Sequence, residues 1–140
     1  MTFNLARSLS RIRQTISGNQ YWKDRKDLRY YKLVVTLARE FGPRALSVID
    51  VGSADTRVLD SVDWIPHRFA LDRGFAFRPC DATYIQTDFM DFKPARLFDL
   101  VFCLQVLEHL EDPTAFAKKL LSSVYSTKEG SLPRVKLQTH

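Results

Sequence analysis

The sequence predicts a single α/β domain built on a doubly wound, Rossmann-like parallel sheet. Short apolar runs rich in β-branched residues alternate with helical patterns along the chain. The run at 98–104 is apolar at every position except Asp99, which is typical of a central strand buried on both faces. A glycine, Gly52, directly follows the first run. Sheets of this kind bind ligands beyond the carboxyl ends of their strands, so polar residues at those ends are candidates for function.

Length and composition exclude several classes of protein. The chain has 140 residues, 45% of them hydrophobic and 26% charged, as in an ordinary globular domain. Its uncharged apolar runs are too short to span a bilayer. Cys80 and Cys103 form no disulfide framework and no zinc-binding pattern, so we expect reduced thiols and a cytoplasmic location.

Residues 1–27 are predicted to form a basic amphipathic helix and a connector. Leu5, Leu9, Ile12 and Ile16 follow helical spacing. Residues 1–45 carry ten Lys or Arg against three acids, whereas residues 46–140 carry eleven against thirteen. A solvated helix face explains this charge, and contact with nucleic acid or an anionic surface is the alternative. The absence of acids before Asp24 also fits a mitochondrial presequence.

Residues 28–124 are predicted to form the main domain, followed by a polar tail at 125–140. The expected elements, in chain order, are a helix at 28–41, a strand at 46–51, a short helix at 55–60, strands at 68–71, 82–86 and 97–104, and a helix at 113–124. Asp112 and Pro113 have the residue types favoured at the N-cap and first position of the last helix. The tail offers one further short edge strand within 132–137.

Polar residues follow each predicted strand. They are Asp50 and Gly52, then Asp72, then Asp88, and finally Gln105, Glu108 and His109. The carboxyl ends of parallel strands meet at one edge of a sheet, so we expect these residues to gather there. A buried carboxylate at Asp50 is costly unless it meets a cationic ligand or backbone N–H groups, and we expect one of the two.

The order of these residues resembles a class I S-adenosylmethionine-dependent methyltransferase of the type-11-like group. The matching stretches are Val48-Ile-Asp-Val-Gly-Ser-Ala-Asp55, Asp72 at twenty-two residues after Asp50, Thr87-Asp-Phe89, and Phe98-Asp-Leu-Val-Phe-Cys-Leu-Gln-Val-Leu-Glu-His-Leu-Glu-Asp-Pro113. The resemblance covers about residues 28–124 and implies the strand order 3-2-1-4 with flanking helices.

The resemblance also implies a cofactor, S-adenosylmethionine, and a role for each matching residue. Asp50 and the turn at Gly52, Ser53 and Ala54 would face the methionine part of the cofactor. Asp72 would accept hydrogen bonds from the ribose hydroxyls. Asp88 would accept a hydrogen bond from the adenine amino group, with Phe89 beside the ring. Leu104 and Gln105 would line the floor next to the sulfonium. For Asp72 and Asp88 the alternative is a turn or capping role.

The chain departs from the family pattern in two respects. Ala54 and Thr56 stand where the family usually has glycines, and Asp55 adds an acid beside them. We therefore expect Thr56 to narrow the approach to the turn. The family fold has seven strands and only four are evident here, so we expect a shortened domain. The exposed edge of the strand at 97–104 would pair with a second copy or a partner protein.

Methyl transfer demands little chemistry from protein side chains, because the sulfonium is already activated. His109 is the candidate general base, and a capping or packing role for Glu108 and His109 is the alternative. Gln105 replaces the first acid of an E-x-x-E-H metal motif, so no metal site is expected.

Three functions are compatible with the sequence. A methyltransferase acting on a small-molecule, lipid or RNA acceptor is favoured. A non-catalytic or truncated binding or assembly module is the main alternative. A nicotinamide-dependent oxidoreductase would need G-x-G-x-x-G, of which residues 52–57 retain only Gly52.

Overall fold

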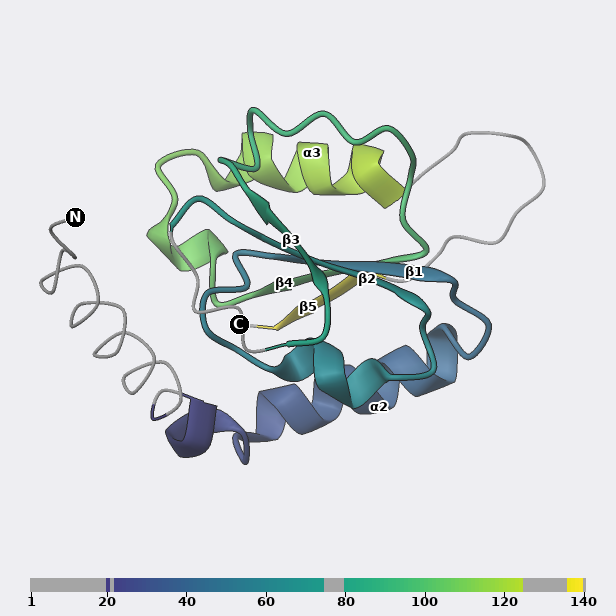
Figure 1. Cartoon of the computed structure of the whole chain (residues 1–140). Coiled ribbons are helices and arrows are strands. Elements are labelled where there is room, and N and C mark those ends of the chain that lie inside the picture. Colours follow the sequence, from purple (N-terminus) through teal and green to yellow (C-terminus); the bar gives the residue numbers. More distant parts are fainter. Residues whose placement is uncertain (1–19, 21, 75–79, 125–135, 140) are drawn as a thin grey trace, which may run out of the picture.

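A five-stranded parallel sheet forms the centre of the domain (Figure 1). The computed structural model describes residues 20, 22–74, 80–124 and 136–139. The strands are β1 (Ser47–Val51), β2 (His67–Asp72), β3 (Thr83–Gln86), β4 (Leu100–Leu104) and β5 (Lys136–Thr139). Their order is β3-β2-β1-β4-β5, and every neighbouring pair is parallel. The predicted fold class and the order 3-2-1-4 are confirmed.

Helices cover both faces of the sheet (Figure 1). The helix α2 (Arg29–Phe41) and the 3₁₀ helix η1 (Val58–Val62) lie on one face, and α3 (Pro113–Val124) lies on the other. A second 3₁₀ turn, η2 (Leu107–His109), leads from β4 to α3. All five residues of β1 and of β4 are buried, as the sequence predicted for central strands covered on both faces.

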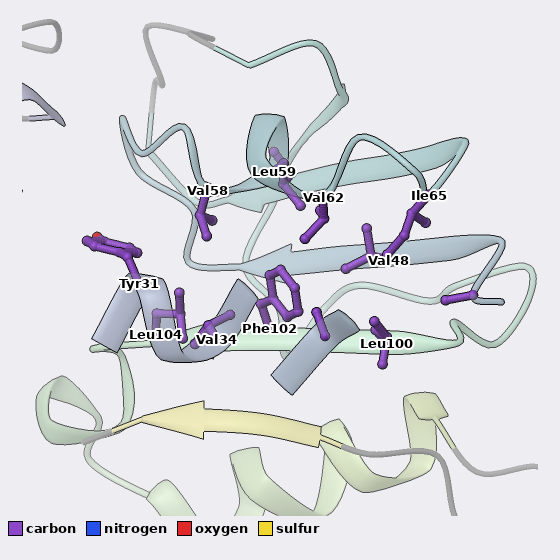
Figure 2. Packing of buried hydrophobic residues seen from close by; sticks show 13 residues of the cluster. Tyr31, Val34, Val48, Val58, Leu59, Val62, Ile65, Leu100, Phe102 and Leu104 are labelled. Carbon is purple, nitrogen blue, oxygen red and sulfur yellow. The ribbon is translucent and has the colours of Figure 1, made fainter. Parts of the chain in front are cut away.

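Alternate strand residues supply two separate hydrophobic clusters. Val48, Leu100 and Phe102 pack with α2 and η1 in the first cluster, which Figure 2 shows from close by. Ile49, Val51, Val101 and Cys103 pack toward α3 in the second cluster. This division follows from the period of two in a strand, which sends neighbouring side chains to opposite faces. Cys103 is a buried free thiol, as predicted.

The helix α2 buries part of the stripe that the sequence predicted. Tyr31, Val34 and Ala38 are buried, whereas Leu28 and Phe41 at the two ends of the stripe are 41% and 54% exposed. The Gly42 N–H donates to the Ala38 carbonyl at 2.9 Å, which ends the helix where Gly42-Pro43 predicted.

Two expectations about the elements need correction. The short helical segment after β1 begins at Val58 rather than Asp55, because a turn closed by the Thr56 N–H on the Ser53 carbonyl comes first. The edge of β4 is not exposed, because β5 pairs with it from Val101↔Lys136 to Leu104↔Thr139. Strand edges carry unpaired N–H and C=O groups, and here a segment of the same chain satisfies them. The helix predicted within residues 3–16 lies outside the described residues.

The N-terminus of α3 carries a predicted cap that the structure confirms. The Ala115 N–H donates to Asp112 Oδ1 at 2.9 Å, and Pro113 occupies the first helical position. The cap matters because α3 covers the second cluster with Phe116, Leu120 and Val124.

Replacing Asp112 should therefore lower stability. We expect Asp112→Ala to reduce the free energy of unfolding by about 1 kcal/mol, measured by urea unfolding. Asp112→Asn keeps a side-chain oxygen for the Ala115 N–H and should lose only a few tenths of that amount. Equal losses in the two variants would contradict a capping role.

Candidate functional site

The turn after β1 requires a glycine. Gly52 has a φ of +76°, in the left-handed region that favours glycine. A Cβ at this position would lie 2.4 Å from Val106 Cγ2, which is closer than two non-bonded carbon atoms approach in proteins. The N–H groups of Gly52 and Ser53 both donate to the Leu71 carbonyl, at 2.8 and 3.1 Å. The turn is thus held against the end of β2 and packed under the segment that follows β4.

Asp72 ties this turn to the end of β2 through its side chain. Its Oδ2 accepts the Ala54 N–H at 2.9 Å, and its Oδ1 accepts the Gly74 N–H at 2.7 Å. Each carboxylate oxygen has two acceptor sites, so both retain capacity for a further donor. The carboxylate is half-buried and faces a pocket. The turn role weighed for Asp72 and its exposure to a ligand are therefore compatible.

The loop after β4 has the second unusual backbone conformation near the pocket. Gln105 has a φ of +56°, and Ala54 in the first turn has a φ of +43°. In the part of the chain that the structure describes, these are the two non-glycine residues with positive φ. Such conformations cost on the order of 1–3 kcal/mol each and tend to occur at ligand sites. Here they belong to the loops that follow β1 and β4.

A pocket of about 710 Å³ opens at the carboxyl ends of the strands. Small-molecule sites usually have volumes of roughly 300–1,000 Å³. Its walls include six of the residues that the sequence singled out, namely Gly52, Asp72, Asp88, Phe89, Gln105 and His109. Four others do not line it, namely Asp50, Ser53, Ala54 and Leu104. Ala54 still contributes, because its N–H holds Asp72.

Asp88 and Phe89 occupy the wall formed by the segment after β3. Asp88 Oδ1 accepts the Met90 N–H at 2.8 Å, an Asx-type turn that fixes the carboxylate beside the pocket. The Phe89 side chain is only 4% exposed and packs on Phe116, with ring centroids 4.9 Å apart. Lys119 Nζ lies 5.1 Å from the centroid of the Phe89 ring. Phe89 is therefore a rigid wall continuous with the second cluster.

Several pocket residues were missed by the sequence reasoning. They are Val51, Leu71, Arg73, Met90, Val106, Leu110, Glu111, Asp112, Ala115 and Phe116. Arg73 directly follows Asp72, so its position after a strand was a usable signal. The residues of α3 gave no such signal, because only the packing of α3 on the sheet brings them to the pocket. Asp72, Asp88, Glu111 and Asp112 make the lining acidic, against Arg73 and His109.

Asp50 lies behind the turn, on the face of β1 opposite to Val51. Its carboxylate is 2% exposed and accepts one hydrogen bond, from the Thr56 hydroxyl at 3.4 Å. Of the two partners expected for Asp50, a cationic ligand or backbone N–H groups, the second is not supplied by the turn, whose N–H groups bond to Leu71 and Asp72. Burial raises the pKa of Asp50 from 3.8 to about 7, a shift that Asp72 reinforces and the Thr56 hydroxyl opposes.

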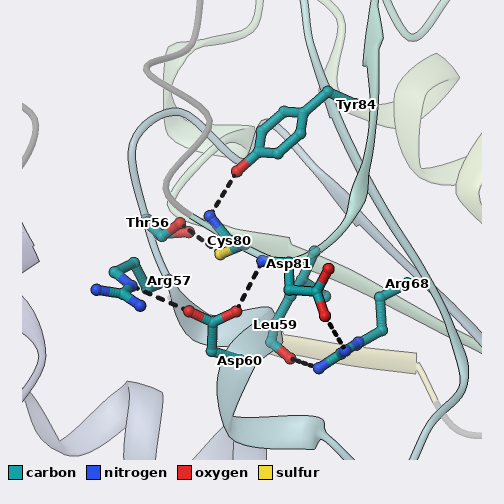
Figure 3. Close-up of polar contacts among 8 residues, drawn as sticks. All are labelled: Thr56, Arg57, Leu59, Asp60, Arg68, Cys80, Asp81 and Tyr84. Atoms are coloured by element: carbon teal, nitrogen blue, oxygen red, sulfur yellow. Dashed lines mark hydrogen bonds and ion pairs between the residues drawn. The ribbon is translucent and has the colours of Figure 1, made fainter. Parts of the chain in front are cut away.

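Thr56 has a different role from the one expected. Its side chain is buried and donates to Asp50, and it does not line the pocket. The Thr56 carbonyl accepts from the Cys80 thiol at 3.0 Å (Figure 3). Thr56 therefore joins the buried acid to the segment that leads into β3.

That segment is fastened to η1 by a polar cluster (Figure 3). The Cys80 N–H donates to the Tyr84 hydroxyl at 2.9 Å, and the Asp81 N–H donates to Asp60 Oδ1 at 3.0 Å. Arg68 donates to the Leu59 carbonyl and forms an ion pair with Asp81 at 3.2 Å. Burial raises the pKa of the Cys80 thiol to about 12, so this thiol is protonated and unreactive at neutral pH.

Two further searches concern the described residues alone. Among them, no group of three or more His, Cys, Asp or Glu side chains is arranged to hold a metal ion. No helix in the same ranges is long and apolar enough to cross a membrane.

Comparison with known proteins identifies the fold. No protein-family model matches the chain, and no curated protein matches it in sequence. Solved structures do match. The plantazolicin methyltransferase BpumL, solved with a pentazolic desmethylPZN analog and SAH, has a TM-score of 0.62 at 16% identity, covering 81% of this chain and 49% of that one.

Two further matches are named as methyltransferases of sugars. The sugar N-methyltransferase KedS8 from a Streptoalloteichus species has a TM-score of 0.58 at 20% identity, over 76% of this chain and 49% of that one. SAM-bound CalS10, an amino pentose methyltransferase from Micromonospora echinaspora, has a TM-score of 0.59 at 18% identity, over 89% and 53%. The chain spans about half the length of these proteins. At these identities the likeness establishes the methyltransferase fold, as the resemblance predicted.

The raised pKa of Asp50 predicts a pH-dependent stability. Between pH 4 and pH 7 the folded protein holds a proton on Asp50 that the unfolded chain releases. The free energy of unfolding therefore falls as pH rises through that window. Relative to Asp50→Asn, the wild type should lose about 2–3 kcal/mol of unfolding free energy between pH 5 and pH 8. Urea unfolding at both pH values measures it. Asp63→Asn, at an exposed acid, should follow the wild type; an Asp50→Asn profile parallel to the wild type would contradict the argument.

Proposed function

We propose that the chain binds S-adenosylmethionine in this pocket and that its activity is methyl transfer to a small-molecule, lipid or RNA acceptor. The observation that carries the proposal is the meeting of Gly52, Asp72 and Asp88 in one pocket of a methyltransferase fold. Three separate strand ends supply them, at the edge where sheets of this type bind ligands. The solved relatives by fold include complexes with SAM and with SAH.

The residues present fit this cofactor in shape and in charge. Gly52 lines the pocket, and the pocket has the volume of a small-molecule site. S-adenosylmethionine carries a net positive charge, and acids predominate in the lining. Asp72 retains acceptor capacity for the ribose hydroxyls, Asp88 would accept from the adenine amino group, and Phe89 would flank the ring.

The cofactor supplies an activated methyl group on its sulfonium. The task of the protein is then to bind, orient and shield the reacting groups. Gln105, exposed at the end of β4, would face the reacting end of the pocket. His109 is exposed on η2 and lines the pocket, and in this proposal it would accept a proton from the methyl acceptor. The free thiols Cys80 and Cys103 support a reducing compartment such as the cytoplasm.

A non-catalytic binding module is the second candidate. The observation that favours it is the coverage, since this chain matches only about half of each of those methyltransferases. Both candidates predict cofactor binding. They differ in turnover, so methylation of an added acceptor separates them once binding is established.

Calorimetric titration with S-adenosylmethionine and S-adenosylhomocysteine tests the proposal. We expect micromolar binding of the wild type and a 10- to 100-fold loss in Asp72→Ala, since hydrogen bonds to a charged group contribute about 1.5–3 kcal/mol. Asp63→Ala removes an exposed acid that does not line the pocket and should bind as the wild type does. A folded wild type that binds neither compound would refute the proposal, as would unchanged binding by Asp72→Ala.

A further inference from the structure

The buried carboxylate of Asp50 has no cationic partner in the described part of the chain. Its one hydrogen bond is with the Thr56 hydroxyl, at 3.4 Å. The charged group that acts on it is another acid, Asp72. A carboxylate that is 2% exposed, and on which the charge of a second carboxylate acts, is costly to ionise, so its surroundings favour the protonated form.

A second buried polar side chain, Ser53, belongs to the turn that follows Asp50 in the chain. Ser53 Oγ is buried, and the described residues offer it no hydrogen bond. Asp50, Ser53 and Thr56 are thus three buried polar residues in and next to the turn at Gly52, and the Thr56 hydroxyl donates to Asp50. Native proteins rarely leave buried polar atoms unsatisfied, and exceptions often mark functional sites. Val51 and Gly52, the two residues that follow Asp50 in the chain, line the pocket, and the Ala54 N–H of the same turn donates to Asp72.

We propose that Asp50 makes the pocket selective for a cationic cofactor over its neutral product, by giving up a proton when the cation binds. The inference rests on the proposed function and adds a specificity-determining residue to it. The proton passes from the Asp50 carboxylic acid to solvent, and the carboxylate left behind balances the added positive charge. No covalent bond other than this O–H bond changes.

The selectivity follows from charge. S-adenosylmethionine has one positive charge more than S-adenosylhomocysteine, because its sulfur is a sulfonium rather than a thioether. Charges interact strongly through the low-dielectric interior around Asp50, so the cation stabilises the ionised carboxylate. By linkage, affinity for the cation must then increase as pH rises through the pKa of Asp50 in the free protein, which is about 7. The affinity for the neutral product, S-adenosylhomocysteine, should increase far less over the same pH range.

Other titratable and charged groups near the site must be separated from Asp50. Asp72 on β2 faces the turn from one side, and the Cys80 thiol contacts Thr56 from the segment before β3. Within the pocket lie Arg73, Asp88, His109, Glu111 and Asp112. His109 is the histidine among the residues that line this pocket, so its contribution needs its own control.

The test is calorimetry of the 140-residue chain with each compound at pH 6, 7 and 8, in phosphate and in Tris. The two buffers differ in ionisation enthalpy. The difference between the heats of binding measured in them therefore gives the number of protons released. For S-adenosylmethionine we expect affinity to rise about five- to tenfold from pH 6 to pH 8, with about half a proton or more released at pH 6. For S-adenosylhomocysteine the change should stay below twofold.

Variants assign the effect to Asp50. Asp50→Asn should remove both the pH dependence and the proton release, whereas His109→Gln should keep them. Thr56→Val deletes the hydroxyl that favours the ionised carboxylate, so the affinity profile should move to higher pH. This variant supports or overturns the inference even if Asp50→Asn fails to fold, as judged by circular dichroism.

Three results would overturn the inference. They are an Asp50→Asn or Thr56→Val profile identical to the wild type, loss of the effect in His109→Gln, and an equal pH dependence for the two compounds. Binding of both compounds with such a result would leave the proposed function intact. Binding of neither compound by the folded wild type would overturn both proposals together.

Discussion

The Asp72 carboxylate holds together the part of the molecule on which the site depends. Its two oxygens accept N–H groups from Ala54 and Gly74, so one side chain fixes the turn after β1 and the loop after β2. The Leu71 carbonyl accepts two further N–H groups from the same turn. Without these bonds, the left-handed backbone of Gly52 and Ala54 would have little to maintain it. The pocket exists because these neighbouring strand ends are joined in this way.

The sheet could be predicted because its central strands carry a strong signal. β1 and β4 are buried at every position, and their apolar runs are evident in the sequence. Gathering of Gly52, Asp72 and Asp88 also followed, since parallel strands end at a common edge. The fifth strand gave only a weak signal in a polar tail, and its pairing with β4 depends on contacts distant in sequence.

Side-chain direction limited the prediction of the site. Asp50 and Leu104 are on the face of the sheet covered by α2, whereas Val51 faces the pocket beside α3. The period of two in a strand separates neighbours in this way, but sequence spacing does not tell which face holds the ligand. Val106 was missed for a similar reason, because its contact with Gly52 arises from the turn at Gln105. Thr56 stands where the family usually has a glycine, and the structure accounts for it, because its hydroxyl donates a hydrogen bond to Asp50.

Asp50 illustrates a cost that folding alone does not explain. A buried apolar residue at the end of β1 would avoid the desolvation that raises its pKa. An acid at this buried position, with Ser53 Oγ unsatisfied in the turn that follows, favours a role in binding over a role in stability. In our proposal, the same environment would also make the carboxylate respond to a positive charge in the pocket.

The central claim is that the ligand binds against the Asp72-linked turn, and amide NMR tests it most directly. In a ¹H–¹⁵N spectrum of the folded chain titrated with S-adenosylmethionine, the Ala54 and Gly74 amides, whose hydrogens Asp72 accepts, should shift together with those of Gly52 and Asp88. Amides of α2 distant from the pocket, such as Arg39, should remain in place. Saturable shifts confined to other parts of the chain, or no shifts at all, would contradict the account.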